Sequence, residues 1–208
     1  MMNELGFFLG VCFLLAMVPG PGAMVIIRQA SQDTRRSAFT TLLGNETALL
    51  VWGIAAACGL TALVAASQVA YDAIRFTGAA ILLFLGVQAL VNRRGARPPA
   101  QGPGDGPRSG SAWQSYSAGL FTNLMNPKAG VFAMSFLPQF APTGLPRFWG
   151  FALLAGCWAL MDALWFTGVI WGIGKTRGLL SAPRVWRRIS QVSGLAMIGL
   201  GIRAAVDG

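Results

Sequence analysis

The sequence contains no histidine and only seven acidic residues among 208. The missing histidine excludes histidine-based catalysis, and the missing GxxxxGK[ST] phosphate loop argues against ATP-driven transport by this chain alone. The three cysteines, Cys12, Cys58 and Cys157, lie in apolar stretches without metal-ligand spacing and are interpreted as small buried residues. No disulfide, metal site or cofactor is therefore predicted.

Charged residues are scarce at 11%, whereas 54% of the residues are hydrophobic and the mean hydropathy is +0.57. This balance excludes an ordinary soluble domain and predicts a polytopic membrane protein with a single domain over residues 1–208. The net charge of +9 could favour nucleic acid, but most Lys and Arg residues lie in three short loops between apolar stretches. Such a pattern sets membrane orientation, so the predicted partner is the lipid bilayer and not nucleic acid.

Six apolar segments are long enough to cross a bilayer as helices, which needs roughly 20 residues each. They cover about residues 5–27, 38–66, 69–92, 113–140, 147–173 and 189–206. The first has no basic region before it and no small-residue cleavage site, so it is expected to be a retained span. The predicted fold class is all-α.

Basic residues gather in the loops at 28–37, 93–112 and 174–188, whereas the opposite side has few. The positive-inside rule places these three loops in the cytoplasm and both termini outside. The Gly- and Pro-rich segment 95–112 is interpreted as a flexible linker, with 93–112 as a cytoplasmic connection between the halves 1–92 and 113–208. Because each half has an odd number of spans, the second enters the membrane in the opposite orientation, as in an inverted repeat.

Two spans contain a break at comparable positions. Val18-Pro19-Gly20-Pro21-Gly22 interrupts the first span, and Asn126-Pro127 interrupts the fourth. Proline removes a backbone donor and disfavours the α region at the preceding residue. Paired broken helices are a sequence pointer to a transporter binding site. The alternative is that the prolines only kink helices for packing.

The half-helices that begin near Pro21 and Pro127 would point their N-termini toward the membrane interior. Such ends offer free backbone donors and favour an anion. Lys128 adds a full charge, and a lysine at that depth is costly unless it is paired or faces water. A substrate that carries a carboxylate is therefore expected, with Asn123 and Asn126 as polar contacts or, alternatively, as links between helices.

Two carboxylates lie within predicted spans, Glu46 in the second and Asp162 near the middle of the fifth. Either could pair with Lys128, take up a proton or bind a substrate ammonium group, and a purely structural ion pair is the alternative. For Asn45 a hydrogen bond between helices is the preferred interpretation. The predicted proton-coupling residues are Asp162 and Glu46, and the predicted substrate-binding residues are Pro19, Gly20, Pro21, Gly22, Asn123, Asn126, Pro127 and Lys128.

Glycines in the third and sixth predicted spans would allow close helix approach, within the chain or between subunits of a homo-oligomer. They are Gly78, Gly86, Gly194, Gly199 and Gly201.

Three motifs resemble the LysE/RhtB family of amino-acid exporters: Pro19-Gly20-Pro21, the run GLFTNLMNPKAGVFAMSFLPQF at 119–140, and DALWF at 162–166. The resemblance covers nearly the whole chain and implies a six-helix inner-membrane protein that exports amino acids or their derivatives by proton motive force. It also implies roles for the matching positions Pro19, Gly20, Pro21, Asn123, Asn126, Pro127, Lys128 and Asp162. The chain departs from the family pattern at Gly22, where Asn is frequent, and at Asn45-Glu46, where the family usually lacks an acid.

The predicted function is secondary active export of amino acids or derivatives across the inner membrane by proton antiport, without enzymatic activity. One alternative is a membrane enzyme for a hydrophobic substrate, but the sequence has no clustered metal ligands and no serine beside a plausible base. Another is a channel-like protein in which Lys128 and Asp162 form a static pair. Saturation and counterflow would distinguish a carrier from a pore.

Overall fold

The computed structural model describes residues 2–18, 20–66, 68–91, 111–142, 144–175 and 183–206. All regular elements in these ranges are helical, which confirms the predicted all-α fold. They are α1 (Met2–Met17), α2 (Pro21–Gln32), α3 (Arg35–Ala66), α4 (Gln68–Val91), α5 (Ala112–Leu124), α6 (Pro127–Val131), the π-helix η1 (Phe132–Phe136), the 3₁₀-helix η2 (Leu137–Phe140), α7 (Arg147–Lys175) and α8 (Pro183–Val206).

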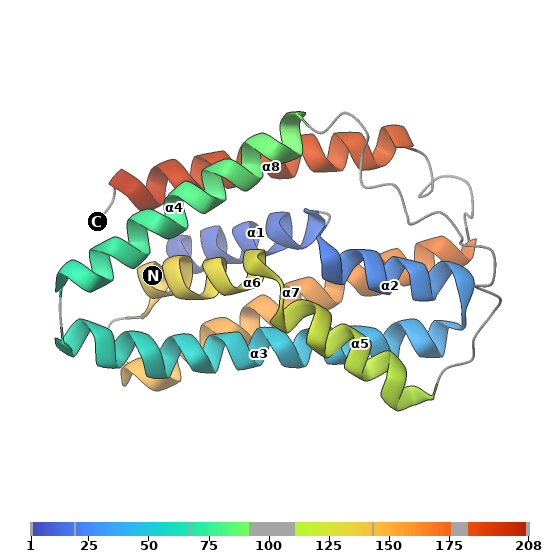
Figure 1. The fold of residues 1–208 in the computed structure, drawn as a ribbon, viewed down its shortest axis with the longest axis horizontal. Coiled ribbons are helices and arrows are strands. Elements are labelled where there is room, and N and C mark those ends of the chain that lie inside the picture. The colour runs from blue at the N-terminus through green and yellow to red at the C-terminus, as the bar shows by residue number, and fades with distance from the viewer. Residues whose placement is uncertain are drawn as a thin grey trace.

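Most helices lie lengthwise along the molecule (Figure 1). Both termini, the end of α3 and the start of α4 lie at one end, and the corner between α2 and α3 lies at the other. Successive long segments therefore run in alternating directions. In the described residues, Arg35–Gly59 of α3 and Arg147–Ile173 of α7 are each long and apolar enough to cross a membrane. Leu5–Met17 and Pro21–Ser31 meet the same test together as one broken span bent by 62°.

The first predicted break is present between α1 and α2. Gly20 is the N-cap of α2, with an extended backbone at φ −131° and ψ 178°. Pro21 is well placed at the first helical position, where a backbone N–H would have no partner within the helix. Pro19, the other proline of this break, lies outside the described residues.

The second predicted break separates α5 from α6 at Asn126. The Asn126 side chain caps α6 by accepting a hydrogen bond from the Lys128 backbone N–H at 3.1 Å. After only five residues α6 gives way to the π-helix η1 and then to the 3₁₀-helix η2. Pro138 lies in η2 and cannot donate a backbone hydrogen bond, which favours a departure from α-helical pairing there.

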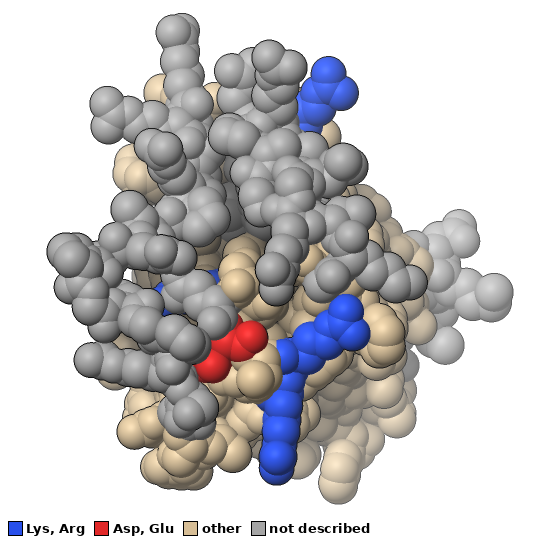
Figure 2. Space-filling model, turned by 90° about the vertical axis from the view of Figure 1, so that its right-hand side faces the viewer, with Lys and Arg blue, Asp and Glu red and all other residues tan. Residues whose placement is uncertain are grey.

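The predicted basic loop at 28–37 is mostly helical, which corrects its assignment as a loop. The helix α2 continues to Gln32, and only Asp33 and Thr34 separate it from α3. Exposed basic side chains with an acidic group beside them mark this end of the molecule (Figure 2). The guanidinium of Arg35 lies 5.0 Å from the ring centroid of Trp171 on α7. The predicted basic loop at 93–112 falls outside the described residues except for Ser111 and Ala112. The predicted loop at 174–188 is too long: α7 continues to Lys175 and α8 begins at Pro183, before the predicted start of the sixth span at 189, and only 176–182 lie outside the described residues.

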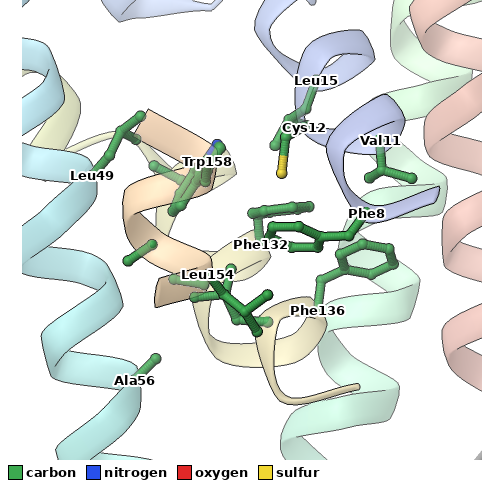
Figure 3. Close-up of a cluster of buried hydrophobic side chains, with 14 of the residues drawn as sticks. Phe8, Val11, Cys12, Leu15, Leu49, Ala56, Phe132, Phe136, Leu154 and Trp158 are labelled. Carbon is green, nitrogen blue, oxygen red and sulfur yellow. The ribbon is translucent and has the colours of Figure 1, made fainter. Parts of the chain in front are cut away.

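A buried cluster packs the π-helix η1 against α1 and α7 (Figure 3). The ring centroid of Phe132 lies 4.8 Å from that of Trp158 and 5.0 Å from that of Phe136. Cys12 is fully buried in this cluster, as expected, whereas Cys58 is exposed, so its predicted burial is wrong. Because lipid tails are as apolar as these side chains, the cluster contributes mainly through van der Waals fit.

Two glycines allow α3 and α5 to cross closely. A Cβ at Gly44 on α3 would overlap the carbonyl oxygen of Tyr116, and one at Gly119 on α5 would overlap that of Thr41. This contact holds α3 and α5 together near the second break.

The predicted glycine contacts of the third and sixth spans are confirmed in part. Gly86, Gly194 and Gly201 let α4 and α8 pack closely, so they lie at an interface within the chain. Gly78 faces Ser135 of η1 instead of α8, and nothing lies within 4 Å of a Cβ built at Gly199.

Candidate functional site

Lys128 of α6 reaches across to the end of α1. Its Nζ donates hydrogen bonds to the carbonyl oxygens of Leu15 and Val18, each at 3.1 Å. Carbonyls in the last turn of a helix form its negative end, and the Leu15 carbonyl also accepts from the Val18 backbone N–H at 3.1 Å. The ammonium group therefore caps one broken helix from the first turn of the other, and it uses two of its three hydrogens to do so.

Lys128 and Asp162 do not form a direct ion pair. Both residues are among those described, and the Lys128 Nζ lies more than 4.0 Å from the carboxyl oxygens of Asp162. The Asp162 carboxyl instead accepts a hydrogen bond from the Asn45 side chain at 3.0 Å. The static pair that the sequence left open is thus absent from this structure. Both side chains nevertheless line the same small cavity.

Glu46 and Asp162 meet through one amide. Asn45 Nδ2 donates to Asp162 Oδ2 at 3.0 Å and to Glu46 Oε1 at 3.3 Å. Asp162 is only 7% exposed, and the second oxygen of Glu46, Oε2, is buried without a hydrogen-bond partner among the described residues. The structure therefore places the two predicted proton-coupling acids side by side, although 116 positions separate them in the sequence.

A chain of asparagines connects this acid pair to the second break. Asn123 Nδ2 donates to the carbonyl oxygen of Asn45 at 3.3 Å, and Asn126 Nδ2 donates to Asn123 Oδ1 at 3.0 Å. The indole of Trp52 donates to the carbonyl oxygen of Asn123 at 3.3 Å. Asn45, Asn123 and Asn126 are buried and line the cavity. Asn123 also links α5 to α3, as one of the two predicted roles required, whereas contact of Asn123 or Asn126 with a substrate stays a prediction.

The cavity lies between the two helix breaks and has a volume of about 20 Å³. Its polar or glycine walls are Gly20, Gly22, Asn45, Asn123, Asn126, Lys128 and Asp162. The volume is that of roughly one water molecule, and water needs two or more polar partners, which these walls supply. A substrate the size of an amino acid cannot enter unless the helices separate.

Three other predicted site residues, Pro21, Pro127 and Glu46, do not line this cavity. Pro21 and Pro127 are exposed and begin α2 and α6, so they shape the breaks without lining the cavity. Glu46 is joined to the cavity through Asn45. A Cβ at Gly22 would lie 2.5 Å from Asn45 Oδ1, so glycine is needed for this close approach.

The sequence did not assign Asn45 to the site, because a hydrogen bond between helices was the preferred interpretation there, and it gave Trp52 no role. Asn45 does make the expected hydrogen bonds between helices, but it also stands at the centre of the polar network. Its only sequence signal was its place beside Glu46 in an apolar segment. Trp52 had no distinguishing signal among the aromatic residues of the spans.

A second, mostly apolar cavity of about 610 Å³ lies on the other side of the second break. Its walls include Trp52, Gly78, Pro127, Met134 and Ser135, from α3, α4, α6 and η1. Asn126 is shared by the walls of both cavities.

Broken helices that meet at buried charged groups are typical of secondary transporters in membranes. The chain belongs to the LysE type translocator family, whose family model matches residues 13–208. The protein is therefore an integral membrane protein of a translocator family and not an enzyme, as the sequence motifs indicated.

Curated relatives cover almost the whole chain. It is 24% identical to the homoserine/homoserine lactone efflux protein of Salmonella typhi, over 90% of this chain and 89% of the relative. It is 21% identical to the uncharacterized membrane protein YrhP of Bacillus subtilis, over 99% of this chain and all of the relative. It is 27% identical to the uncharacterized membrane protein PA4757 of Pseudomonas aeruginosa, over 96% of this chain and 93% of the relative. No solved structure matches the chain.

Proposed function

We propose that the protein exports amino acids or their derivatives across the inner membrane by proton antiport. The observation that carries this proposal is one polar cavity between two helix breaks, with an ammonium on one wall and a carboxyl on another. A zwitterionic amino acid carries the complementary pair of charges. Buried charges within a membrane are costly and commonly mark a substrate or proton pathway.

The proposed roles follow from the contacts. Lys128 has one ammonium hydrogen beyond its two bonds to α1, and this hydrogen is directed to the substrate carboxylate. Backbone N–H groups at the start of α2, after Gly20, add to this anion site. Asp162 receives either the substrate ammonium or a proton, and Glu46 shares the proton with it through Asn45. Export then alternates between proton-loaded and substrate-loaded states.

The proposed topology has six transmembrane segments in two inverted repeats, 1–92 and 113–208, joined by a cytoplasmic linker at 93–112. In support, α4 packs along α8 and α3 packs along α7. These are the third with the sixth segment and the second with the fifth, which are the pairs that a two-fold axis in the membrane plane brings together. Both termini would lie outside the cytoplasm, at the end of the molecule where Figure 1 marks them.

Homoserine or its lactone is a reasonable first substrate to test, because a relative that covers most of the chain is named as an efflux protein for them. Homoserine has the carboxylate and ammonium that Lys128 and Asp162 would bind. The lactone lacks the free carboxylate, so it would not use the ammonium of Lys128. A comparison of the two substrates therefore separates the carboxylate site from the amine site.

Transport by purified protein in liposomes with a transmembrane pH gradient tests the proposal. Homoserine and a panel of amino acids are offered to the parent, Lys128→Ala and Asp162→Asn. We expect saturable, gradient-dependent transport and counterflow by the parent and loss of gradient-driven transport in both variants. Unchanged transport of every compound by both variants would show that the assigned roles are wrong, and flux without saturation or counterflow would favour a channel.

A further inference from the structure

Asn45 occupies the point where both helix breaks and both acids meet. Its side chain is 3% exposed and lies on α3. Its amide nitrogen bonds Asp162 of α7 and its own neighbour Glu46, while its backbone oxygen accepts from Asn123 of α5. Its side-chain oxygen lies against Gly22 in the first turn of α2. One residue thus touches elements of both proposed repeats.

The amide nitrogen of Asn45 has two hydrogens, and both are directed to carboxyl oxygens. A carboxyl that gains a proton becomes a hydrogen-bond donor through its new O–H group, so it needs the amide N–H less. Proton binding therefore weakens at least one of the bonds that hold the Asn45 side chain in place.

The released side chain is not free to turn in every direction. Its oxygen lies so close to the Gly22 Cα that a Cβ there would be 2.5 Å away. Movement toward α2 therefore displaces the start of that half-helix. On the other side, Asn123 bonds the backbone carbonyl of Asn45, and Asn126 bonds Asn123 and caps α6. This connection fixes the Asn45 backbone relative to the second break, so the released side chain moves against a held backbone.

We infer that Asn45 is the positioning residue that couples proton binding at Glu46 and Asp162 to movement of the first helix break relative to the second. The inference rests on the proposed function, because it concerns how the proton step drives the same substrate site. It assigns to Asn45 a role in coupling and none in holding the substrate. The Asn45 amide has two arrangements: bonded to both carboxyls, or released from one of them. Coupling between proton and substrate requires such a two-state element, whose equilibrium both the acid pair and the substrate cavity influence.

Asn45→Leu tests the inference, since leucine is similar in size and has no hydrogen-bond donor. Two rates are measured in liposomes: accumulation driven by a pH gradient, and counterflow exchange without a gradient. We expect gradient-driven accumulation to fall by about tenfold or more, as the loss of a hydrogen bond to a charged group implies, and counterflow to fall by a smaller factor, because Asn45 also lines the cavity. Thr47→Val is the matched control on α3, because it removes the hydroxyl that accepts from Tyr116 at 3.1 Å, away from the acids.

Asn45→Ser covers the case in which leucine prevents folding, because serine keeps one donor and is smaller. It is expected to lose gradient-driven accumulation in part and to keep counterflow. Retention of both rates in the folded Asn45 variants would overturn the inference, as would an equal loss of both rates, which would indicate a structural role. A parent protein that shows no response to a pH gradient would instead refute the proposed function itself.

Discussion

Gly22→Ala adds a single methyl group at the tightest point of the site. The new Cβ would lie 2.5 Å from Asn45 Oδ1, whereas ordinary contact begins near 3.4 Å, so the amide must move by about 0.9 Å. The bond from Asn45 to Asp162 is 3.0 Å long and would be broken by such a shift. Overpacking of this kind costs about 1–3 kcal/mol. A cost of that size borne by the transporting arrangement corresponds to about a 5- to 150-fold loss of gradient-driven transport.

Two other glycines of the first broken span provide graded controls for the same chemical change. A Cβ at Gly10 has nothing within 4 Å, so Gly10→Ala should transport at the parental rate. A Cβ at Gly20 meets Lys128 Cε and Nζ at 3.6 Å, which is ordinary contact, so Gly20→Ala should lose little. The expected order of transport rates is Gly10→Ala, then Gly20→Ala, then Gly22→Ala.

The assay is initial-rate homoserine or amino-acid uptake into liposomes with an acidic interior, with each variant matched for amount of folded protein by size-exclusion chromatography. Equal rates for Gly22→Ala and Gly10→Ala would refute the reasoning, because Asn45 would then move without consequence for transport. The same refutation follows if Gly20→Ala is the more damaging change.

Three further predictions concern the charge, the topology and the helix crossings. Lys128→Met removes the ammonium from the cavity, so it should weaken the binding of homoserine by about tenfold or more and affect the binding of the lactone less. Equilibrium binding to purified protein measures both affinities. Equal losses for both ligands would contradict a carboxylate site. In a cysteine-free background, Arg36→Cys at the corner of α2 and α3 should react with an impermeant maleimide only from the cytoplasm. Leu145→Cys should react only from outside. The reverse pattern would overturn the proposed orientation. Gly119→Leu should lower the thermal stability in detergent far more than Gly156→Leu. A Cβ at Gly119 overlaps the Thr41 carbonyl, whereas a Cβ at Gly156 has nothing within 4 Å. Similar melting temperatures would show that the crossing of α3 and α5 tolerates separation.

The helix breaks and most of the polar residues beside them could be predicted from sequence because their signals are local. Proline at Pro21 and Pro127 determines where a helix can begin, whatever the tertiary fold. A lysine in an apolar segment is costly in any arrangement, so Lys128 is conspicuous without a structure. Pro21 and Pro127 lie at the start of α2 and α6, which confirms the predicted helix breaks.

The meeting of Glu46 with Asp162 could not be predicted, because it depends on how distant helices pack. Neighbours such as Asn45 and Glu46 point about 100° apart on a helix, and the pattern of α3 does not show which of them faces α7. Close packing of α3 on α5 through Gly44 and Gly119 decides this, since it brings Asn45 to Asn123. The π-helix η1 likewise depends on packing of Phe132 and Phe136 that no local motif encodes.

In the proposed exchange, a zwitterionic substrate and protons occupy the same cavity in turn. The most direct measurement is accumulation of labelled homoserine, alongside the amino-acid panel, by liposomes that contain the purified protein and have an acidic interior. We expect accumulation that a protonophore abolishes and that is lost in both Lys128→Ala and Asp162→Asn. Accumulation that persists in both folded variants, or that follows a sodium gradient and not a proton gradient, would contradict it.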